Sequence, residues 1–171
     1  MEIVPSGRER SFSQDELIVS KTDPQGKITY ANRVFLRVAG YDERELLGVQ
    51  HNIIRHPEMP RCVFRFLWDT IGAKREIFAY VLNLCKNGDH YWVFAHVTPS
   101  LNDAGEIIGY HSSRRVPERR AIDAIAPVYK SLHAEERKHS SPRQGLEAST
   151  GMLLDYLGQR GGDYEQFVFS L

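Results

Sequence analysis

The sequence predicts an α+β domain in which a five-stranded antiparallel sheet carries helices on one face and is followed by a helical C-terminal extension. Two observations lead to this fold class. Segments rich in aromatic and β-branched residues form two groups, near residues 17–31 and 76–116, and helical patterns lie together between them. Within each group, short turns typical of hairpins join neighbouring strands. Because helices and strands do not alternate along the chain, antiparallel pairing is expected.

The first group of elements ends with a helix that stops at Gly72. Two strands are expected on either side of the Pro-Gln-Gly turn in "LIVSKTDPQGKITYAN". Asn32 or the residue before it can cap a helix in "RVFLRVAGY", which Gly40 ends, and "DERELLG" adds one helical turn. In "HNIIRHPEMPRCVFRFLWDTI", which begins at His51, Pro60 suits the first turn of an amphipathic helix.

The second group supplies three strands. Two long runs flank Asn87-Gly88 in "EIFAYVLNLCKNGDHYWVFAHVTPS", the strongest short-range hairpin signal, and "GEIIGYHSSRRV" adds a fifth strand. After Pro117, "ERRAIDAIAPVYKSLHAEERKH" is expected to be helical, "SSPRQG" a linker and "LEASTGMLLDYLGQR" a second helix, with "GGDYEQFVFSL" unassigned. The expected division is a cap segment at 1–16, a central domain at 17–116 and a helical extension at 117–171.

Composition limits the classes of function. A chain of 171 residues that is 42% hydrophobic suits one globular domain with an extension. Basic and acidic residues balance at 22 each, so no overall charge favours nucleic acid. No apolar run approaches the roughly 20 residues of a membrane span and no signal peptide is evident, so a cytoplasmic protein is expected. Cys62 and Cys85 lack a CxxC spacing and are interpreted as small buried hydrophobic residues.

Strand alternation predicts which side chains share a face of the sheet. Tyr91, Val93, Ala95 and Val97 lie on one face, to which pairing can add Val81, Asn83, Cys85, Gly109 and His111. The small residues there suggest a cavity, with Asn83 and His111 as its polar groups. These two find partners either in a ligand or in neighbouring backbone.

The opposite face is expected to be strongly apolar. Its predicted members are Phe78, Tyr80, Leu82, Leu84, Trp92, Phe94, Ile108 and Tyr110. A monomer rarely exposes such a patch. Either the helices after Pro117 or a second copy of the chain is therefore expected to cover it, the latter as a homodimer.

Five segments between about Leu17 and Val116 resemble one known family. "HNIIRHPEMP", the segment Phe64 to Trp68, "KNGDHYWV", "VTP" and "GYHSSRR" together resemble the aerotaxis-receptor type of PAS domain. The resemblance implies a PAS fold in the sensor domain at 17–116, with FAD bound non-covalently. It further implies a redox or oxygen signal that reaches a chemotaxis receptor or other signalling partner by protein contact, without substrate turnover.

The resemblance also implies a set of cofactor-binding residues. Arg55 and His56 match the family's Arg-His pair associated with FAD, and an arginine fork suits phosphate. Trp68 could line the ring site, and Asn83 matches the asparagine at the polar edge of the isoalloxazine in flavin-binding relatives. His111 departs from the glutamine of light-sensing relatives and the apolar residue frequent in aerotaxis receptors; near flavin N5 it could respond to protonation. The full expected set is Asn52, Arg55, His56, Trp68, Asn83, Val93, Ala95 and His111.

Two departures and three alternatives bear on this interpretation. Ile77 stands where aerotaxis receptors usually have Trp, and Glu58 where they have Asp. "QHNIIRH" has no cysteine for a flavin photoadduct. Haem b remains an alternative through His51, His56 or His111, as does a cofactor-free interaction module. Arg55 and His56 could also be only a surface pair at a helix entry. No hydrolase, zinc-protease, Walker or dinucleotide motif is present, so neither enzymatic activity nor a metal site is expected.

Overall fold

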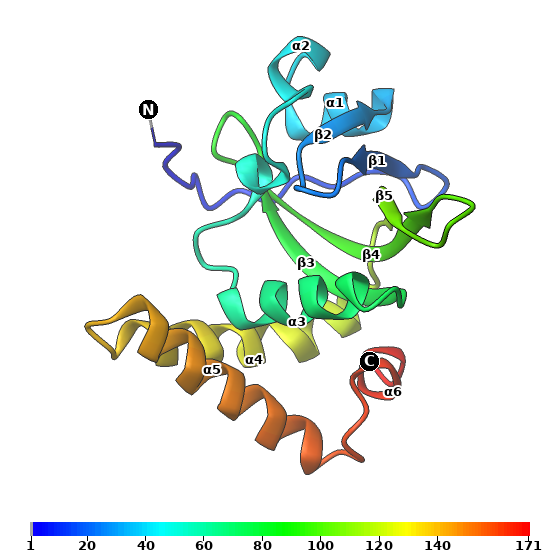
Figure 1. Cartoon of the computed structure of the whole chain (residues 1–171). Coiled ribbons are helices and arrows are strands. Elements are labelled where there is room, and N and C mark those ends of the chain that lie inside the picture. Colours follow the sequence, from blue (N-terminus) through cyan, green and yellow to red (C-terminus); the bar gives the residue numbers. More distant parts are fainter. Residues whose placement is uncertain (1) are drawn as a thin grey trace. The chain divides into compact units, whose positions relative to one another are not determined.

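The computed structural model describes residues 2–171 and contains a five-stranded antiparallel sheet (Figure 1). The strands are β1 Ile18–Thr22, β2 Ile28–Ala31, β3 Ile77–Leu84, β4 His90–Leu101 and β5 Ile107–Arg115. The helices are α1 Arg33–Ala39, α2 Glu43–Leu46, the 3₁₀ turn η1 His51–Ile54, α3 Arg61–Gly72, α4 Arg119–Arg137, α5 Pro142–Gly158 and α6 Tyr164–Phe169. The strand order β2-β1-β5-β4-β3 places the last strand beside the first. The predicted fold class is confirmed.

The described residues form two compact units. The first runs to His56 and takes in Thr70–Pro117, so it contains the whole sheet together with α1 and α2. The second consists of Pro57–Asp69 and Glu118–Leu171, and so joins most of α3 to the C-terminal helices. The expected division at residues 16 and 117 stays a prediction.

Asn32 is the residue that connects β1 to α1. Its side-chain oxygen accepts hydrogen bonds from the Phe35 amide at 3.0 Å and from the Val19 amide at 3.1 Å, and its amide nitrogen donates to the Leu17 carbonyl at 2.8 Å. One side chain thus caps the helix and fixes the start of the strand. Gly40, at φ 77°, ends α1 as predicted.

The β3–β4 turn holds the N-terminal segment. Gly88 has φ 90°, and a Cβ there would lie 2.4 Å from the Val4 carbonyl oxygen. The Ser6 amide donates to the Gly88 carbonyl at 2.8 Å, and the Ser6 hydroxyl donates to the Asp89 carboxylate at 2.6 Å. Arg8 pairs with the same carboxylate at 3.3 Å. Residues before β1 are therefore fixed across this hairpin.

Register divides the sheet residues into an inner and an outer face. Asn83 pairs with Tyr91, Val81 with Val93, and Ala79 with Ala95. On the other edge of β4, Ala95 pairs with Arg114 and Val97 with Ser112, and Ser20 of β1 also pairs with Ser112. Since directly paired residues point to the same side, these residues define the inner face. The Phe35 ring of α1 lies against Arg114, so α1 covers part of it.

Three residues of β5 lie on the opposite face of the sheet from the one predicted, because the expected register of this strand is wrong by one residue. His111 pairs with Thr98 and Gly109 with Ser100, which places both on the outer face, while Tyr110 pairs with Pro99 and lies on the inner one. A shift of one residue moves every side chain of a strand to the other face. Gly109 does not make room for a ligand; a Cβ there would lie 2.4 Å from the Thr22 carbonyl oxygen of the neighbouring strand.

The outer face is apolar on β3 and β4 and polar on β5. The Phe78, Tyr80, Leu82, Leu84, Trp92 and Phe94 assignments are confirmed, with Phe78 stacked on Phe94 at 5.8 Å and on His96 at 4.2 Å. Trp92 is only 8% exposed. Ile108 lies by the irregularity at Ser100/Leu101 and is 57% exposed, so it does not extend this face. A homodimer through the outer face stays a prediction.

The second unit is organised around Glu136 of α4. This buried carboxylate accepts hydrogen bonds from the Cys62 amide at 3.1 Å and the Ser149 hydroxyl at 2.9 Å, and it pairs with Arg61 Nε at 3.3 Å. It thereby satisfies an amide in the first turn of α3. α4 and α5 lie side by side (Figure 1), and a Cβ at Gly145 would lie 2.4 Å from the Glu136 carbonyl oxygen.

The linker expected at residues 140–145 is shorter in the structure than predicted. Ser141 is the N-cap of α5, its hydroxyl accepting a hydrogen bond from the Gln144 amide at 3.5 Å, and Pro142 already belongs to the helix. Proline is favoured in the first turn of a helix, where its missing N–H would have no partner. The unassigned C-terminal residues form α6, in which Tyr164 contacts Phe66 at 4.7 Å.

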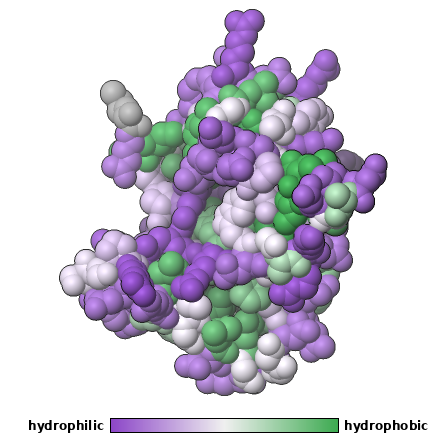
Figure 2. Space-filling model, viewed as in Figure 1, coloured by the Kyte–Doolittle hydropathy of each residue, from purple (hydrophilic) through white to green (hydrophobic). Residues whose placement is uncertain are grey.

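The cysteines and the surface agree with the sequence interpretation. Cys62 and Cys85 are free and buried, and burial raises the pKa of each thiol to about 11. Figure 2 shows hydrophobic residues in small groups between hydrophilic ones on the face in view. None of the helices within residues 2–171 combines the length and the apolar character needed to cross a bilayer.

Candidate functional site

Four polar residues are buried on the inner face of the sheet. Ser20, Asn83, Tyr91 and Arg114 are all 3% exposed or less, and they come from four different strands. The residues between them are small or aliphatic, such as Val93 and Ala95, which are likewise buried. Buried polar groups require partners, so the bonds that these four make decide what the face can bind.

Arg114 is a buried cation with only part of its hydrogen-bonding capacity used. One terminal nitrogen, Nη2, donates to the Ser20 hydroxyl at 2.6 Å, and the guanidinium lies over the Phe35 ring at 4.6 Å. The other terminal nitrogen, Nη1, and Nε are buried and have no hydrogen-bond partner within residues 2–171. Burial lowers the pKa of Arg114 to about 10, so the side chain stays protonated at neutral pH.

His51 completes a chain of contacts from Arg114 through Ser20. Its Nε2 lies 2.9 Å from the Ser20 hydroxyl, and its ring stacks on Phe35 at 6.0 Å. Burial, and then the positive charge of Arg114, lower the pKa of His51 to about 3. His51 is therefore neutral at pH 7, and Ser20 can accept from Arg114 while donating to the imidazole.

Tyr91 and Asn83 form the second polar pair. The Tyr91 hydroxyl is buried and has no hydrogen-bond partner within residues 2–171. The Asn83 amide nevertheless lies close enough to affect the pKa of this hydroxyl. Burial raises that pKa, so the phenol keeps its proton. Arg55 forms an isolated antiparallel bridge with Asn83, which brings the backbone of the "IRHP" segment to the end of this face.

The structure brings together four of the eight expected site residues, and His56 lies next to one of them in the chain. Asn83, Val93 and Ala95 share the inner face, and Arg55 is joined to Asn83 by backbone pairing. His56 follows Arg55 along the chain and is 4% exposed, with its ring 6.0 Å from that of His90, which pairs with Leu84 of the outer face. Ile77, the position at which aerotaxis receptors carry Trp, is a buried inner-face residue paired with Val97. The departure therefore removes an aromatic ring from this face.

Of the remaining three expected residues, only His111 is excluded from this face by the register, and the assignments of Asn52 and Trp68 stay predictions. Asn52 is exposed on η1, and Trp68 is 40% exposed on α3, in the second compact unit. His111 lies on the outer face, where its Nε2 is 3.2 Å from the Ser113 hydroxyl. Burial and then Lys21 lower the pKa of His111. The expectation that His111 is a polar group of the inner face is wrong.

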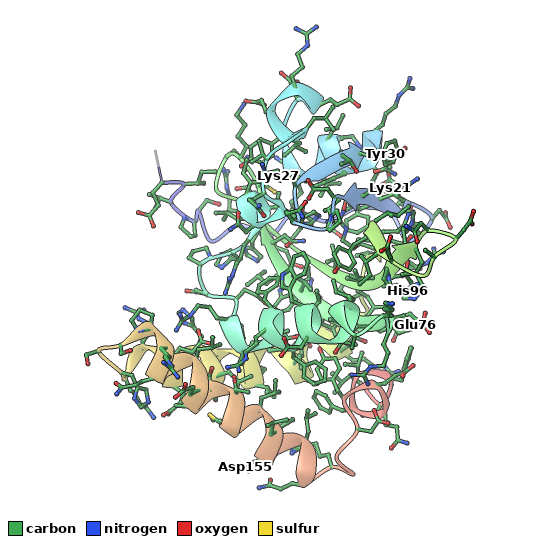
Figure 3. All side chains as sticks on the ribbon, viewed as in Figure 1. Lys21, Lys27, Tyr30, Glu76, His96 and Asp155 are labelled. Carbon is green, nitrogen blue, oxygen red and sulfur yellow. The ribbon has the colours of Figure 1, made fainter. Side chains whose placement is uncertain are left out.

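Polar and charged groups on the outer face are largely paired with each other. Figure 3 shows His96 beside Glu76, whose carboxylate lies 2.7 Å from His96 Nε2. Lys21 lies over the Tyr30 ring at 5.7 Å. Among residues 2–171 no three His, Cys, Asp or Glu side chains converge in a way that could hold a metal ion. Some buried side-chain nitrogen and oxygen atoms have no hydrogen-bond partner within residues 2–171. Among them, only those of Arg114 belong to a charged group.

Sequence reasoning missed Ser20, Tyr91 and Arg114 as polar site residues and considered His51 only for haem. A basic residue in a strand is ordinarily expected on the exposed side. Strand alternation could have identified Arg114. Once Asn83 and Val93 are placed on the inner face, the correct pairing of β5 with β4 places Arg114 there too.

The chain matches known proteins over the same region. A family model described as the PAS fold matches residues 28–114. The chain is 40% identical over 142 residues to the aerotaxis receptor of Escherichia coli (strain K12), a match that covers 83% of this chain and 28% of the receptor. It is 30% identical over 102 residues to the nitrogen fixation regulatory protein of Klebsiella pneumoniae, covering 60% of this chain and 21% of that protein. The chain thus spans less than a third of either relative.

Solved structures agree on the fold. A structure described as "Flavin Analogue Sheds Light on Light-Oxygen-Voltage Domain Mechanism" superposes with a TM-score of 0.60 at 18% identity, covering 68% of this chain and 88% of that one. The dark structure of the blue-light photoreceptor Aureochrome1 LOV gives 0.57 at 24% identity, covering 64% and 82%. Since the family model matches half of the chain and these neighbours share its architecture, the chain belongs to the PAS family.

Proposed function

We propose that this chain is a redox-sensing PAS domain that binds FAD non-covalently on the inner face of its sheet and passes the signal on by protein contact. The observation that carries the proposal is the pair of buried, unsatisfied donors on that face, the Arg114 guanidinium and the Tyr91 hydroxyl. An unpaired buried donor costs about 1–3 kcal/mol, so a ligand that accepts these bonds gains that energy on binding.

The isoalloxazine ring of a flavin fits this set of groups. It is planar and largely apolar, and it carries carbonyl oxygens and ring nitrogens that accept hydrogen bonds. The inner face offers buried donors beside small apolar residues, Val93 and Ala95. When bound, the flavin would supply reversible oxidation and reduction, and the protein would supply binding, orientation and electrostatics.

The choice of FAD rests on the motif at residues 51–60. Arg55 and His56 match the Arg-His pair of the aerotaxis type, and Arg55 is held beside Asn83 by backbone pairing. An arginine fork can bind a diphosphate by charge-assisted hydrogen bonds. The similarity to an aerotaxis receptor and to a light-oxygen-voltage domain studied with a flavin analogue supports a flavin cofactor.

The proposal assigns no substrate turnover to the chain. The signal would pass to a signalling protein such as a chemotaxis receptor, either as a separate chain or as part of a longer one, since the matched aerotaxis receptor is several times longer than the match. A cytoplasmic location belongs to the same proposal.

An absorbance spectrum of the purified protein tests the proposal. The expected result is a flavin band near about 450 nm, with FAD identified in the heat-released supernatant by chromatography. A Soret band would instead identify haem. A protein that shows neither band, and that gains no flavin on reconstitution with FAD, would be an interaction module and would refute the proposal.

A further inference from the structure

The guanidinium of Arg114 has a positive charge that the protein does not neutralise. The polar groups facing it are Ser20, His51 and Tyr91, and burial keeps both His51 and Tyr91 in their neutral forms. No carboxylate within residues 2–171 forms an ion pair with Arg114. An isolated buried charge is strongly unfavourable unless it is paired.

Packing fixes the direction in which this charge acts. Phe35 lies against the guanidinium at 4.6 Å, and Ser20 holds one terminal nitrogen at 2.6 Å. The N–H groups that are left, on Nε and Nη1, belong to the same planar group and so cannot turn toward other partners independently. Because they point from different edges of that plane, they suit a ligand whose negative charge is delocalised over several acceptor atoms.

We propose that Arg114 is the specificity-determining residue of the inner-face site and that it stabilises the reduced, anionic form of the bound flavin over the oxidised, neutral form. This inference rests on the proposed function. Full reduction adds two electrons and one proton to the oxidised flavin, and the ring is left with one negative charge. Arg114 gains a full ion pair only in the reduced form, and it therefore raises the reduction potential of the bound flavin.

The matched variants are Arg114→Gln and Arg115→Gln. Arg115 is the next residue of the same strand, but it pairs with Phe94 on the outer face and is exposed. Both changes remove one positive charge, and only the first removes it from the inner face. Arg114→Lys keeps a positive charge without the planar fork.

The experiment is a potentiometric titration of the FAD-loaded protein with dithionite as the reductant and a reference dye. Arg114→Gln is expected to weaken binding of reduced FAD at least tenfold more than binding of oxidised FAD, which lowers the two-electron potential by about 30 mV or more. Arg114→Lys is expected to show a smaller shift, and Arg115→Gln to keep the wild-type potential.

If Arg114→Gln loses its flavin on purification, the relative affinity for reduced and oxidised FAD can still be measured. Oxidised and anaerobically reduced FAD are then titrated into the apoproteins, and the two dissociation constants are compared. A ratio equal to that of the wild type, with both constants weakened alike, would overturn the role of Arg114 while leaving flavin binding intact. A wild-type protein that binds FAD in neither form would instead refute the proposed function.

Discussion

The Ser20 hydroxyl lies between the guanidinium of Arg114 and the imidazole of His51, and with His51 neutral it can accept from the first and donate to the second. A proton on His51 Nε2 would remove the acceptor and place a second positive charge near Arg114. Burial and the nearby charge of Arg114 therefore hold the pKa of His51 low.

The lowered pKa of His51 predicts how the stability of the folded protein depends on pH. The pKa of His51 is about 3 in the folded protein, against about 6.5 in an unfolded chain. Between these values the unfolded chain binds a proton that the folded protein does not. The stabilisation is thus complete above pH 6.5 and is lost as the pH falls from 6.5 toward 3.

Urea unfolding at pH 7.5 and pH 5 measures the effect. His51→Gln is expected to remove about 1–2 kcal/mol of the acid-induced loss in the free energy of unfolding. His139→Gln is the control, because His139 is exposed, and it should keep the wild-type pH dependence. Equal pH dependence in His51→Gln and the wild type would contradict a neutral His51 with a lowered pKa.

Arg55 is the residue on which the choice of FAD depends most. Its backbone pairing with Asn83 does not need the side chain, so Arg55→Ala should remain folded. Loss of charge-assisted hydrogen bonds is expected to weaken FAD binding about tenfold or more. Flavin fluorescence on titration of the apoprotein gives the dissociation constant, with Arg65→Ala of the exposed α3 surface as the control. Unchanged affinity in Arg55→Ala would exclude this side chain from the site.

At the level of elements, α3 and α4 are connected through one carboxylate. Glu136→Ala would leave the buried Cys62 amide and Ser149 hydroxyl without their acceptor, at an expected loss of about 1–3 kcal/mol in the free energy of unfolding. Glu135→Ala is the matched control on the same helix, since its pairs with Lys138 and His139 are at the surface and worth about 0–1 kcal/mol. Similar losses in the two variants, followed by far-UV circular dichroism, would contradict the role of Glu136.

Some helices and strands could be predicted from the sequence, and others could not. The hairpin at Asn87-Gly88 and the start and end of α1 were predicted because Asn32, Gly40 and Gly88 each act through a local backbone geometry. The register of β5 was not, because "HSSRR" has no apolar alternation to mark its buried side. The start of α5 was placed too late because Ser141-Pro142 reads equally well as a loop or as a helix N-terminus.

For the whole molecule, the candidate site was predictable only in part. Asn83, Val93 and Ala95 follow from the strict alternation of β4 and from hairpin pairing. Arg114 and His51 depend on a contact between β1, β5, α1 and η1, four elements whose mutual placement no local pattern specifies. The family resemblance points to Arg55 and Asn83, and the structure adds Arg114 as a buried cation on the same face of the sheet as Asn83.

A crystal structure of the protein purified with FAD tests the central claim most directly. The isoalloxazine ring is expected against the inner face of the sheet, with an acceptor atom within hydrogen-bond distance of Arg114 Nε or Nη1. Val93 and Ala95 should line the ring, and His111 should be remote from it on the outer face. A ring bound next to His111, or a haem liganded by a histidine in place of the flavin, would contradict the assignment.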